Sequence, residues 1–492
     1  SSAFLKYADF SHYADYFNHM EDENIVQAIP NAKASEWMEE NIPLFECPQH
    51  NFEEMYYYRW WSLRKHIKET PVGYGMTEFL VQRSYSDKYN LIACAIGHHI
   101  YESRWLRDPK YLDQIIHTWY RGNDGGPMKK MDKFSSWNAD AVLARYMVDG
   151  DKDFMLDMKK DLETEYQRWE RTNRLKNGLY WQGDVQDGME ESISGGRKKK
   201  YARPTINSYM YGNAKALSCM GILSGDEGMA MKYGMRADTL RNLVENELWN
   251  TRHQFFETMR TDSSANVREA IGYIPWYFNL PDTTKKYEVA WKEILDEKGF
   301  SAPYGLTTAE RRHPEFRTRG VGKCEWDGAI WPFASAQTLT AMANFMNNYP
   351  QTVLSDSVYF RQMELYVESQ YHRGRPYIGE YLDEVTGYWL KGDQERSRYY
   401  NHSTFNDLMI TGLIGLRPRL DNTIEVNPLI PVDNWDWFCL DNVLYHGHNL
   451  TILWDKNGDR YHCGKGLRIF VDGKEVGYAD TLTRIVCKDV LK

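Results

Sequence analysis

The chain has 492 residues and a formal net charge of −9, with 60 Lys and Arg against 69 Asp and Glu. This acidic balance argues against a nucleic-acid backbone or an anionic membrane surface as the main partner. With 42% hydrophobic and 26% charged residues the composition is globular, and no apolar run approaches the roughly 18 residues of a membrane span. We therefore expect no membrane insertion and a ligand that is neutral or small.

The cysteines give no sign of a structural framework. All seven are scattered, with no CxxC pair and no Cys/His metal spacing, and their number is odd. We expect neither a disulfide framework nor a metal site. The chain opens with Ser1-Ser2 and no initiator Met, as a trimmed chain would, so the absence of a signal peptide leaves export open.

The aromatic content is unusual at 14%, from 17 Trp, 35 Tyr and 19 Phe. Many of these rings lie outside helical stripes, in short clusters with Gly, Asp and Arg. Proteins that act on carbohydrates stack such rings on the apolar faces of sugars, because aromatic rings bury large areas. The alternative is a Tyr-rich core.

Along the chain, residues 1–50 show no clear element and are expected to wrap the rest. From about residue 85 to residue 420 the chain alternates helix-length apolar stripes, such as 91–100 and 139–147, with short loops. Two similar turns, 149–151 and 224–226, place a Gly that can end one helix before an Asp that can cap the next. This part is therefore predicted to be stacked helical hairpins.

The sequence pattern changes after Pro418. Short β-rich runs at 423–426, 443–445, 450–454, 467–471 and 481–486 are separated by turn signals, including Asp455 to Gly458 and Asp472-Gly473-Lys474. Residues 420–492 are therefore predicted to form an antiparallel β-sandwich.

The segment 180–196 holds the densest group of side chains that could take part in catalysis. Asp184, Asp187, Glu190 and Glu191 fall within eight positions, next to Trp181, in a stretch too rich in Gly and Ser for a continuous helix. Crowded carboxylates raise one another's pKa, which a general acid working near neutral pH needs. The segment is interpreted as an active-site loop. A solvated acidic loop or a weak calcium loop is the alternative.

Two further segments are candidates for the same site. Glu380 lies between Gly379 and Tyr381 in a Pro/Gly-marked loop, where a carboxylate could face a cleft. Trp326 and Trp331 lie five positions apart in a loop that enters an Ala-rich helix. These rings could line a sugar site or belong to the core.

Together these segments resemble the six-hairpin (α/α)6-barrel glycosidases of the glucosidase I, trehalase and mannosylglycerate hydrolase group. The matches occur in family order over roughly residues 50–420. They are Gly188-Met189-Glu190 with Ser192, Trp326-Asp327-Gly328-Ala329-Ile330-Trp331, and Glu380-Tyr381 with Thr386-Gly387. Two departures stand out: the family's acid is usually Asp, and its Tyr follows the late Glu one residue further on.

The resemblance implies an architecture and a role. The fold would be mainly α, with a 1–50 wrapping segment, an (α/α)6 toroid over 51–419 and a C-terminal antiparallel β-sandwich over 420–492. The protein would be an exo-acting glycoside hydrolase of the polysaccharide-degrading Bacteroidetes type, working in the periplasm or at the cell surface. It would need no metal or organic cofactor, and its partner would be an oligosaccharide or glycan substrate.

The resemblance also implies an inverting mechanism with two carboxyl groups that face each other across one pocket. Glu190 or Asp187 would protonate the glycosidic oxygen while Glu380 deprotonates a water on the opposite face of the sugar. Other residues would contact the sugar. Rings expected to stack on it are Trp326, Trp331, Trp181 and either Trp60 or Trp61, and groups expected to hydrogen-bond its hydroxyls are Arg203, Asp87 and His402.

Some alternatives stay open at this point. A polysaccharide lyase acting on a uronate is kept in view by the basic run 197–200, and a non-catalytic glycan-binding protein would need the aromatic rings but neither carboxylate. The Trp60-Trp61 pair could equally be packing. His98 and His99 lie on an apolar helix and are expected to be structural.

Overall fold

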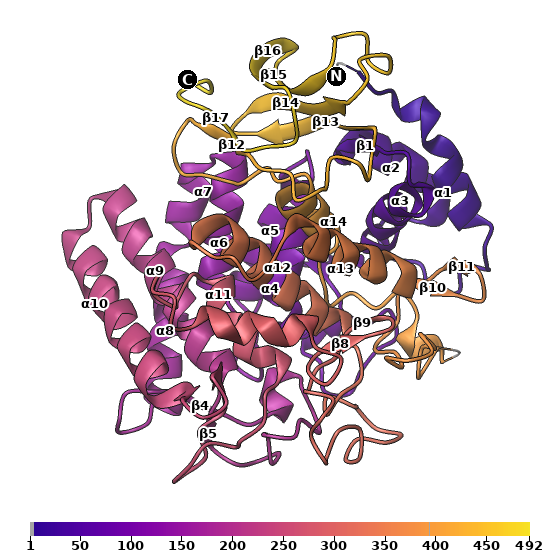
Figure 1. The fold of residues 1–492 in the computed structure, drawn as a ribbon. Helices are drawn as coiled ribbons and strands as arrows, with labels where there is room; N and C mark the ends of the chain where they lie inside the picture. The colour runs from indigo at the N-terminus through magenta and orange to yellow at the C-terminus, as the bar shows by residue number, and fades with distance from the viewer. Residues whose placement is uncertain (1–3, 393) are drawn as a thin grey trace.

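The computed structural model describes residues 4–392 and 394–492. A large helical body carries an antiparallel sheet at one end, and both termini lie at that end (Figure 1). The helices are α1 (Ser11–Asn18), α2 (Ala34–Asn41), α3 (His50–Lys65), α4 (Ile96–Ser103), α5 (Lys110–Arg121), α6 (Asn138–Asp149), α7 (Lys152–Asp157), α8 (Lys159–Asn173), α9 (Pro204–Ser224), α10 (Glu227–Leu243), α11 (Ile274–Tyr277), α12 (Pro332–Asn348), α13 (Asp356–Ser369) and α14 (Asn406–Leu408).

The strands fall into one larger sheet and several short pairs. They are β1 (Leu44–Glu46), β2 (Ile67–Thr70), β3 (Gly73–Met76), β4 (Trp181–Gln182), β5 (Tyr201–Ala202), β6 (Trp249–Asn250), β7 (Phe255–Phe256), β8 (Ser301–Ala302), β9 (Gly305–Leu306), β10 (Tyr371–His372), β11 (Arg375–Pro376), β12 (Ile424–Val426), β13 (Trp437–Tyr445), β14 (His448–Asp455), β15 (Gly466–Val471), β16 (Lys474–Ala479) and β17 (Ile485–Cys487).

The two predicted helix-to-helix turns are confirmed. Gly150 and Gly225 end α6 and α9 in the left-handed conformation, with φ of 69° and 74°. The side chain of Asp151 then accepts a hydrogen bond from the amide of Phe154 at 3.1 Å. Because a left-handed residue reverses the chain and a capped amide starts the next helix, each turn joins two helices of the body.

The apolar stripes also lie where the pattern placed them. The stripe at 139–147 falls within α6, and the stripe at 91–100 runs from a short 3₁₀ turn at 93–95 into α4. His98 and His99 of α4 are buried as expected: His98 lies between the rings of Trp137 and Phe333, and His99 Nε2 lies 2.7 Å from the carbonyl oxygen of Asn401.

The C-terminal part is antiparallel, as predicted. Its five-stranded sheet has the order β1-β13-β14-β15-β16, and β12 pairs with β17. Asp472 and Gly473 both have positive φ, at 50° and 83°, which is the backbone that a tight hairpin turn requires. The first strand of this sheet, β1, comes from the N-terminal region, with Leu44 opposite Asp441.

The N-terminal residues differ from expectation, since they contain the helices α1 and α2. Asp441 of the sheet accepts hydrogen bonds from the amides of Phe4 and Leu5 at 2.7 and 2.8 Å. These contacts hold the start of the chain against its end. The boundaries predicted for the three regions stay predictions.

The pair Trp60 and Trp61 is packing. Both side chains lie in α3 with at most 1% of their surface exposed, and the indole N–H of Trp61 donates to Asn18 Oδ1 at 2.8 Å. This helix joins the N-terminal segment to the body. No helix among the described residues combines the length and the apolar character that crossing a membrane would take.

Candidate active site

The carboxylate-rich segment is a loop, as predicted. The pair β4 and β5 closes its base, and a 3₁₀ turn at Val185–Asp187 ends at Gly188 in the left-handed conformation, with φ of 74°. Gly195 packs so closely on Asp184 that a Cβ there would lie 2.1 Å from a carboxylate oxygen. Small residues are therefore needed to fold this loop. It lies at the end of the helical body opposite the C-terminal sheet (Figure 1).

Asp187 is a buried carboxylate that accepts hydrogen bonds from three side chains. It accepts hydrogen bonds from Arg203 Nε at 2.7 Å, from Thr205 Oγ1 at 2.6 Å and from Ser135 Oγ at 2.6 Å. The side chains of Asp187 and Arg203 both have zero exposure. A carboxylate that already accepts from a buried cationic partner and two hydroxyl donors has no proton of its own to offer a substrate, so it does not suit the role of proton donor.

Arg203 is not positioned to contact a sugar directly, which corrects its predicted role. Its guanidinium is buried behind the loop and also donates to the hydroxyls of Ser192 and Ser194, at 3.3 and 3.1 Å. The arginine therefore holds the loop in place through both ends of the 187–194 stretch.

Glu190 has the properties of a general acid. Its side chain is half-buried, and burial, together with the charges of Glu380 and Asp184, raises its pKa to about 7. A carboxyl group with this pKa keeps its proton over much of the range near neutral pH and can donate it to a leaving group.

Glu380 lies in the loop that follows β11 and is 4% exposed. Burial raises its pKa, whereas the charges of Lys391, Arg396 and Arg83 act to lower it. Arg396 Nη1 lies 4.0 Å from Glu380 Oε2, and that oxygen has no hydrogen-bond partner among the described residues. A buried carboxylate oxygen without a partner is rare in a structural role and is typical of a functional one.

Glu190 and Glu380 are neighbours in the fold, although 380 − 190 = 190 positions separate them; that they face each other as the catalytic pair stays a prediction. The charge of Glu380 raises the pKa of Glu190, an effect that requires proximity. Cys324 lies in the same neighbourhood: burial, followed by the charges of Glu190 and Glu380, raises the pKa of its thiol. The two carboxyl groups thus share one site.

A third carboxyl group, Glu78, belongs to this cluster and was missed by sequence reasoning. It follows β3 and is 4% exposed. Burial, followed by the charges of Glu380 and Glu190, raises its pKa to about 8, against the opposing hydrogen bonds of Cys94 and Tyr400. Those two donors lie 3.3 and 3.5 Å from its oxygens. In the sequence Glu78 is an isolated Glu in an apolar run, so no local signal marks it.

The two loop tryptophans form one wall of stacked rings. Trp326 stacks on Trp331 with centroids 4.7 Å apart, and Trp331 stacks on Tyr381, also at 4.7 Å. The indole N–H groups of both tryptophans lack a hydrogen-bond partner among the described residues. The wall therefore adjoins Glu380 through Tyr381. Direct stacking of either Trp on a sugar stays a prediction.

The other residues predicted to contact the sugar have different surroundings. His402 lies 5.9 Å from the ring of Trp331; burial holds its pKa well below the usual range, and its Nε2 has no partner among the described residues. Asp87 is used differently from the prediction, because its oxygens accept backbone amides of Lys88 and Lys130 at 2.7 and 2.5 Å. Trp181 lies at the base of the loop in β4.

Within the described part of the chain, no group of three or more His, Cys, Asp or Glu side chains is arranged to hold a metal ion. Two carboxylates of the acidic loop have partners of their own. Asp187 pairs with Arg203, and Glu191 pairs with Arg197 at 2.5 Å.

The chain matches two family models. Residues 88–403 match the mannosylglycerate hydrolase MGH1-like glycoside hydrolase domain, and residues 416–477 match the C-terminal domain of glycosyl hydrolase family 65. The first match contains both Glu190 and Glu380, and the second covers most of the C-terminal sheet.

Solved structures show the same fold. A Bacteroides chain named Sialidase is 95% identical with a TM-score of 0.99, and the match covers 99% of this chain and 45% of that one. This chain thus spans about half the length of that relative. The GH63 mannosylglycerate hydrolase from Thermus thermophilus in complex with glucose is 12% identical, with a TM-score of 0.53 over 72% of this chain and 98% of that one.

A third structure, the GH78 family rhamnosidase of a Bacillus species, is 11% identical with a TM-score of 0.56, over 84% of this chain and 40% of that chain. These two distant likenesses concern the fold alone. With the family models they confirm the predicted six-hairpin glycosidase fold with a C-terminal antiparallel sheet.

Proposed function

This chain belongs to the mannosylglycerate hydrolase MGH1-like glycoside hydrolase family, and on that premise we propose that it cleaves a glycan from one end, with inversion at the anomeric carbon. Glu190 is the general acid that protonates the glycosidic oxygen. Glu380 is the general base that removes a proton from the attacking water.

The observation that carries this proposal is that the two carboxyl groups have different surroundings, which act differently on their pKa values. Glu190 has a pKa raised to about 7 and is itself exposed to the charge of Glu380. Burial raises the pKa of Glu380 as well, and the charges of Lys391, Arg396 and Arg83 oppose that rise. Two neighbouring carboxyl groups with different environments provide one protonated and one ionised group at the same pH, which acid and base catalysis require.

The surroundings of the two loop carboxyl groups also favour Glu190 over Asp187 as the acid. Asp187 has three donors, one of which is the buried Arg203, so taking up a proton there would leave Arg203 without its counter-charge. Glu190 forms no ion pair among the described residues, and of the cations only the charge of Arg197 acts to lower its pKa. The family usually has Asp at this position. The side chain of Glu190 is longer, so its carboxyl group reaches further from the loop.

Leaving-group dependence tests the assignment. An activated aryl glycoside departs with little protonation, whereas water attack needs the base whatever leaves. We expect Glu380→Gln to lose turnover of every substrate, and Glu190→Gln to retain activity on aryl glycosides much better than on natural glycans. If Asp187→Asn shows that dependence and Glu190→Gln does not, Asp187 is the acid. Near-normal aryl glycoside turnover by Glu380→Gln would remove Glu380 as the base.

Product analysis tests the reaction class. Proton NMR of the first product anomer distinguishes inversion from retention. A new ultraviolet absorbance would indicate elimination by a lyase, and no product from any glycan would indicate a binding protein. The substrate screen includes plant, fungal and host glycans. Sialylated glycans belong in it because the 95% identical relative carries the name Sialidase.

The same proposal includes the compartment. A Bacteroides relative is nearly identical to this chain, and enzymes that degrade polymeric glycans must meet them outside the cytoplasm. We place the protein in the periplasm or at the cell surface. Fractionation of the native organism followed by immunoblotting tests this, and recovery in the cytoplasmic fraction alone would contradict it.

A further inference from the structure

Glu78 lies in the same cluster as Glu190 and Glu380, but the proposed mechanism gives it no part. Two side chains donate hydrogen bonds to its carboxyl group: the thiol of Cys94, 3.3 Å from Oε1, and the hydroxyl of Tyr400, 3.5 Å from Oε2. These donors show where the carboxyl group lies relative to the catalytic pair, because each of them contacts the loop of one catalytic residue.

Cys94 connects Glu78 to the loop of the general acid. This cysteine is buried in the 3₁₀ turn that precedes α4. A Cβ added to Gly188 would lie 3.3 Å from its sulfur, so the loop backbone packs directly against the thiol. Gly188 is two positions before Glu190. The side chain of Cys94 therefore lies between the Glu78 carboxyl group and the acid loop, and contacts both.

Tyr400 connects Glu78 to the loop of the general base. Its amide donates to the carbonyl oxygen of Ile378 at 3.2 Å, and Ile378 is two positions before Glu380. Its ring packs on that of His402, with centroids 3.9 Å apart. The Glu78 carboxyl group thus lies between the two catalytic loops and accepts one hydrogen bond from each side.

The carboxyl group of Glu78 has two carboxyl neighbours whose charges act on it. Burial, followed by the charges of Glu380 and Glu190, raises its pKa to about 8, and it forms no ion pair among the described residues. In the segment that follows, burial and then the charge of Glu78 raise the pKa of Tyr85, and Arg83 donates to the Tyr85 hydroxyl at 3.4 Å. At neutral pH Glu78 is therefore a protonated, uncharged carboxyl group.

The proton on Glu78 has no short acceptor in the protein. An O–H group normally bonds an oxygen at about 2.5 to 3.0 Å, whereas the Tyr400 oxygen lies 3.5 Å away and a thiol sulfur is a weak acceptor. Glu78 is 4% exposed, the same fraction as Glu380. A buried polar group with such weak partners calls for a functional explanation.

A sugar hydroxyl group is the partner that suits a neutral carboxyl group. Each of the two groups donates one hydrogen bond and accepts others, so they are complementary without any net charge. A carboxyl group that a protein keeps neutral donates a hydrogen bond, which a carboxylate does not do. This chemistry places Glu78 among the groups that recognise a sugar and apart from those that transfer its protons.

We propose that Glu78 contacts the sugar bound between Glu190 and Glu380, by donating a hydrogen bond from its carboxyl O–H to one of the hydroxyl groups of that sugar. The inference rests on the proposed hydrolase function. It adds a residue that selects for substrates with a hydroxyl group at this place, and it makes activity depend on a second protonated carboxyl group besides the general acid.

Hydrolysis of an activated aryl glycoside by Glu190→Gln tests this, because the general acid does not titrate in that variant. The substrates are 4-nitrophenyl glycosides of pentoses, hexoses and deoxyhexoses. We expect kcat/KM to fall about tenfold per pH unit above the pKa of Glu78, which lies below 8 once the charge of Glu190 is absent. Adding Glu78→Gln should remove this fall up to pH 9.5, because an amide donates a hydrogen bond and does not titrate.

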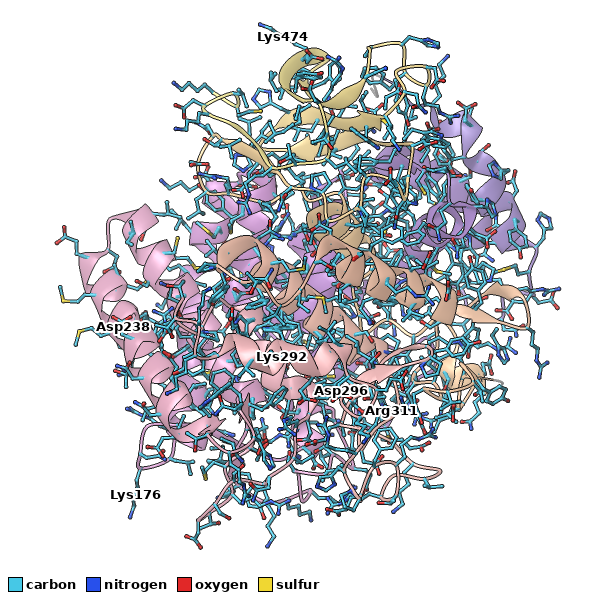
Figure 2. The ribbon with its side chains drawn as sticks, viewed as in Figure 1. Lys176, Asp238, Lys292, Asp296, Arg311 and Lys474 are labelled. Atoms are coloured by element: carbon cyan, nitrogen blue, oxygen red, sulfur yellow. The ribbon has the colours of Figure 1, made fainter. Side chains whose placement is uncertain are left out.

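Truncation and control variants complete the test. Glu78→Leu in the same background should lose about tenfold or more of kcat/KM at pH 6, since it donates no hydrogen bond. Two carboxyl groups outside the site are controls. Burial raises the pKa of Glu165 in α8 to about 7, and Asp238 is exposed on α10 at the outer edge of the helical body (Figure 2). Glu165→Gln and Asp238→Asn should leave the pH profile unchanged.

Three results would overturn the inference: a flat alkaline profile of Glu190→Gln, a fall that persists after Glu78→Gln is added, or an unchanged kcat/KM in Glu78→Leu. Ligand-observed NMR with the free monosaccharides measures sugar binding without turnover. If no glycoside is hydrolysed but a sugar binds about tenfold more weakly to Glu78→Leu than to the wild type, only the hydrolase proposal fails. If hydrolysis occurs and does not depend on Glu78, only the present inference fails.

Discussion

Replacing two neighbouring carboxyl groups of the active-site loop should change the stability of the protein in opposite directions. Glu190→Gln is expected to stabilise it at alkaline pH, and Asp187→Asn is expected to destabilise it at every pH where the protein folds. Both substitutions are nearly isosteric, so the contrast reports the electrostatic surroundings of each carboxyl group.

The magnitude for Glu190 follows from linkage. Its carboxyl group has a pKa of about 7 in the folded protein against an ordinary value of 4.5, a difference of 7 − 4.5 = 2.5. At about 1.4 kcal/mol per pKa unit this sets an upper limit of roughly 3.5 kcal/mol. Because the side chain is half-buried, solvent screening reduces it to about 1 to 2 kcal/mol.

The sign is fixed by which state holds the proton. Between pH 4.5 and about 7 the unfolded chain has released the Glu190 proton and the folded protein still holds it, so stability falls as the pH rises through this range. Glutamine removes that loss. The gain from Glu190→Gln should therefore be largest at pH 8 and should shrink toward zero as the pH falls to 4.5.

The opposite effect at Asp187 comes from its buried partner. Asparagine would leave the Arg203 guanidinium buried with no counter-charge, since both side chains have zero exposure. Removing one member of such a pair typically costs about 3 to 5 kcal/mol. Arg203→Met combined with Asp187→Asn should recover part of this loss, because the unpaired charge is then gone.

Urea unfolding at pH 5 and pH 8, followed by tryptophan fluorescence, measures both effects through the transition midpoint and slope. Equal destabilisation of the protein by Glu190→Gln and Asp187→Asn at pH 8 would refute the electrostatic origin of the contrast. A gain from Glu190→Gln that is the same at both pH values would refute it too, since the effect would then come from packing.

Two further predictions concern catalysis and packing. The kcat/KM of hydrolysis should fall as the pH rises above about 7, because Glu190 then loses the proton that it donates; a pH–rate profile that stays flat to pH 9 would contradict this. Gly97→Ala should destabilise the protein by about 1 to 3 kcal/mol or prevent folding, because its Cβ would lie 2.1 Å from the ring of Trp137. Gly228→Ala is the control, since its Cβ would have no neighbour closer than 3.7 Å, and its midpoint in urea should change little.

Features determined by neighbouring residues could be predicted from the sequence. The turn at Gly150 and Asp151 needs only a left-handed residue and a capping side chain, and these two residues are adjacent in the sequence. The hairpin at Asp472 and Gly473 is equally local. The helices α1 and α2 were not predicted, because their apolar faces are short and they pack on α3, as the stacked rings of Tyr13 and Tyr57 show.

The same distinction holds for the candidate active site: residues with a local signal were identified, and residues whose role depends on distant partners were not. Glu190 and Glu380 were identified because each lies in a loop of distinctive composition, and the order of the motifs resembled a known family. Glu78 was not, since its role depends on Tyr400 and on charges more than a hundred positions away. Arg203 was assigned to the sugar because a sequence shows residue type but does not show that the guanidinium is buried against Asp187.

The loop also explains how carboxyl groups three residues apart can have different roles. Gly188 adopts a left-handed conformation between them, which reverses the chain so that Asp187 turns inward to Arg203 while Glu190 is left near Glu380. The inward carboxylate fixes the loop through a buried ion pair, and removing either member would leave a buried charge without a partner. Glu190 is held close to a second negative charge, which is the arrangement that keeps a proton on Glu190 near neutral pH. The acidic loop therefore needs both carboxyl groups, and only Glu190 has to reach the substrate.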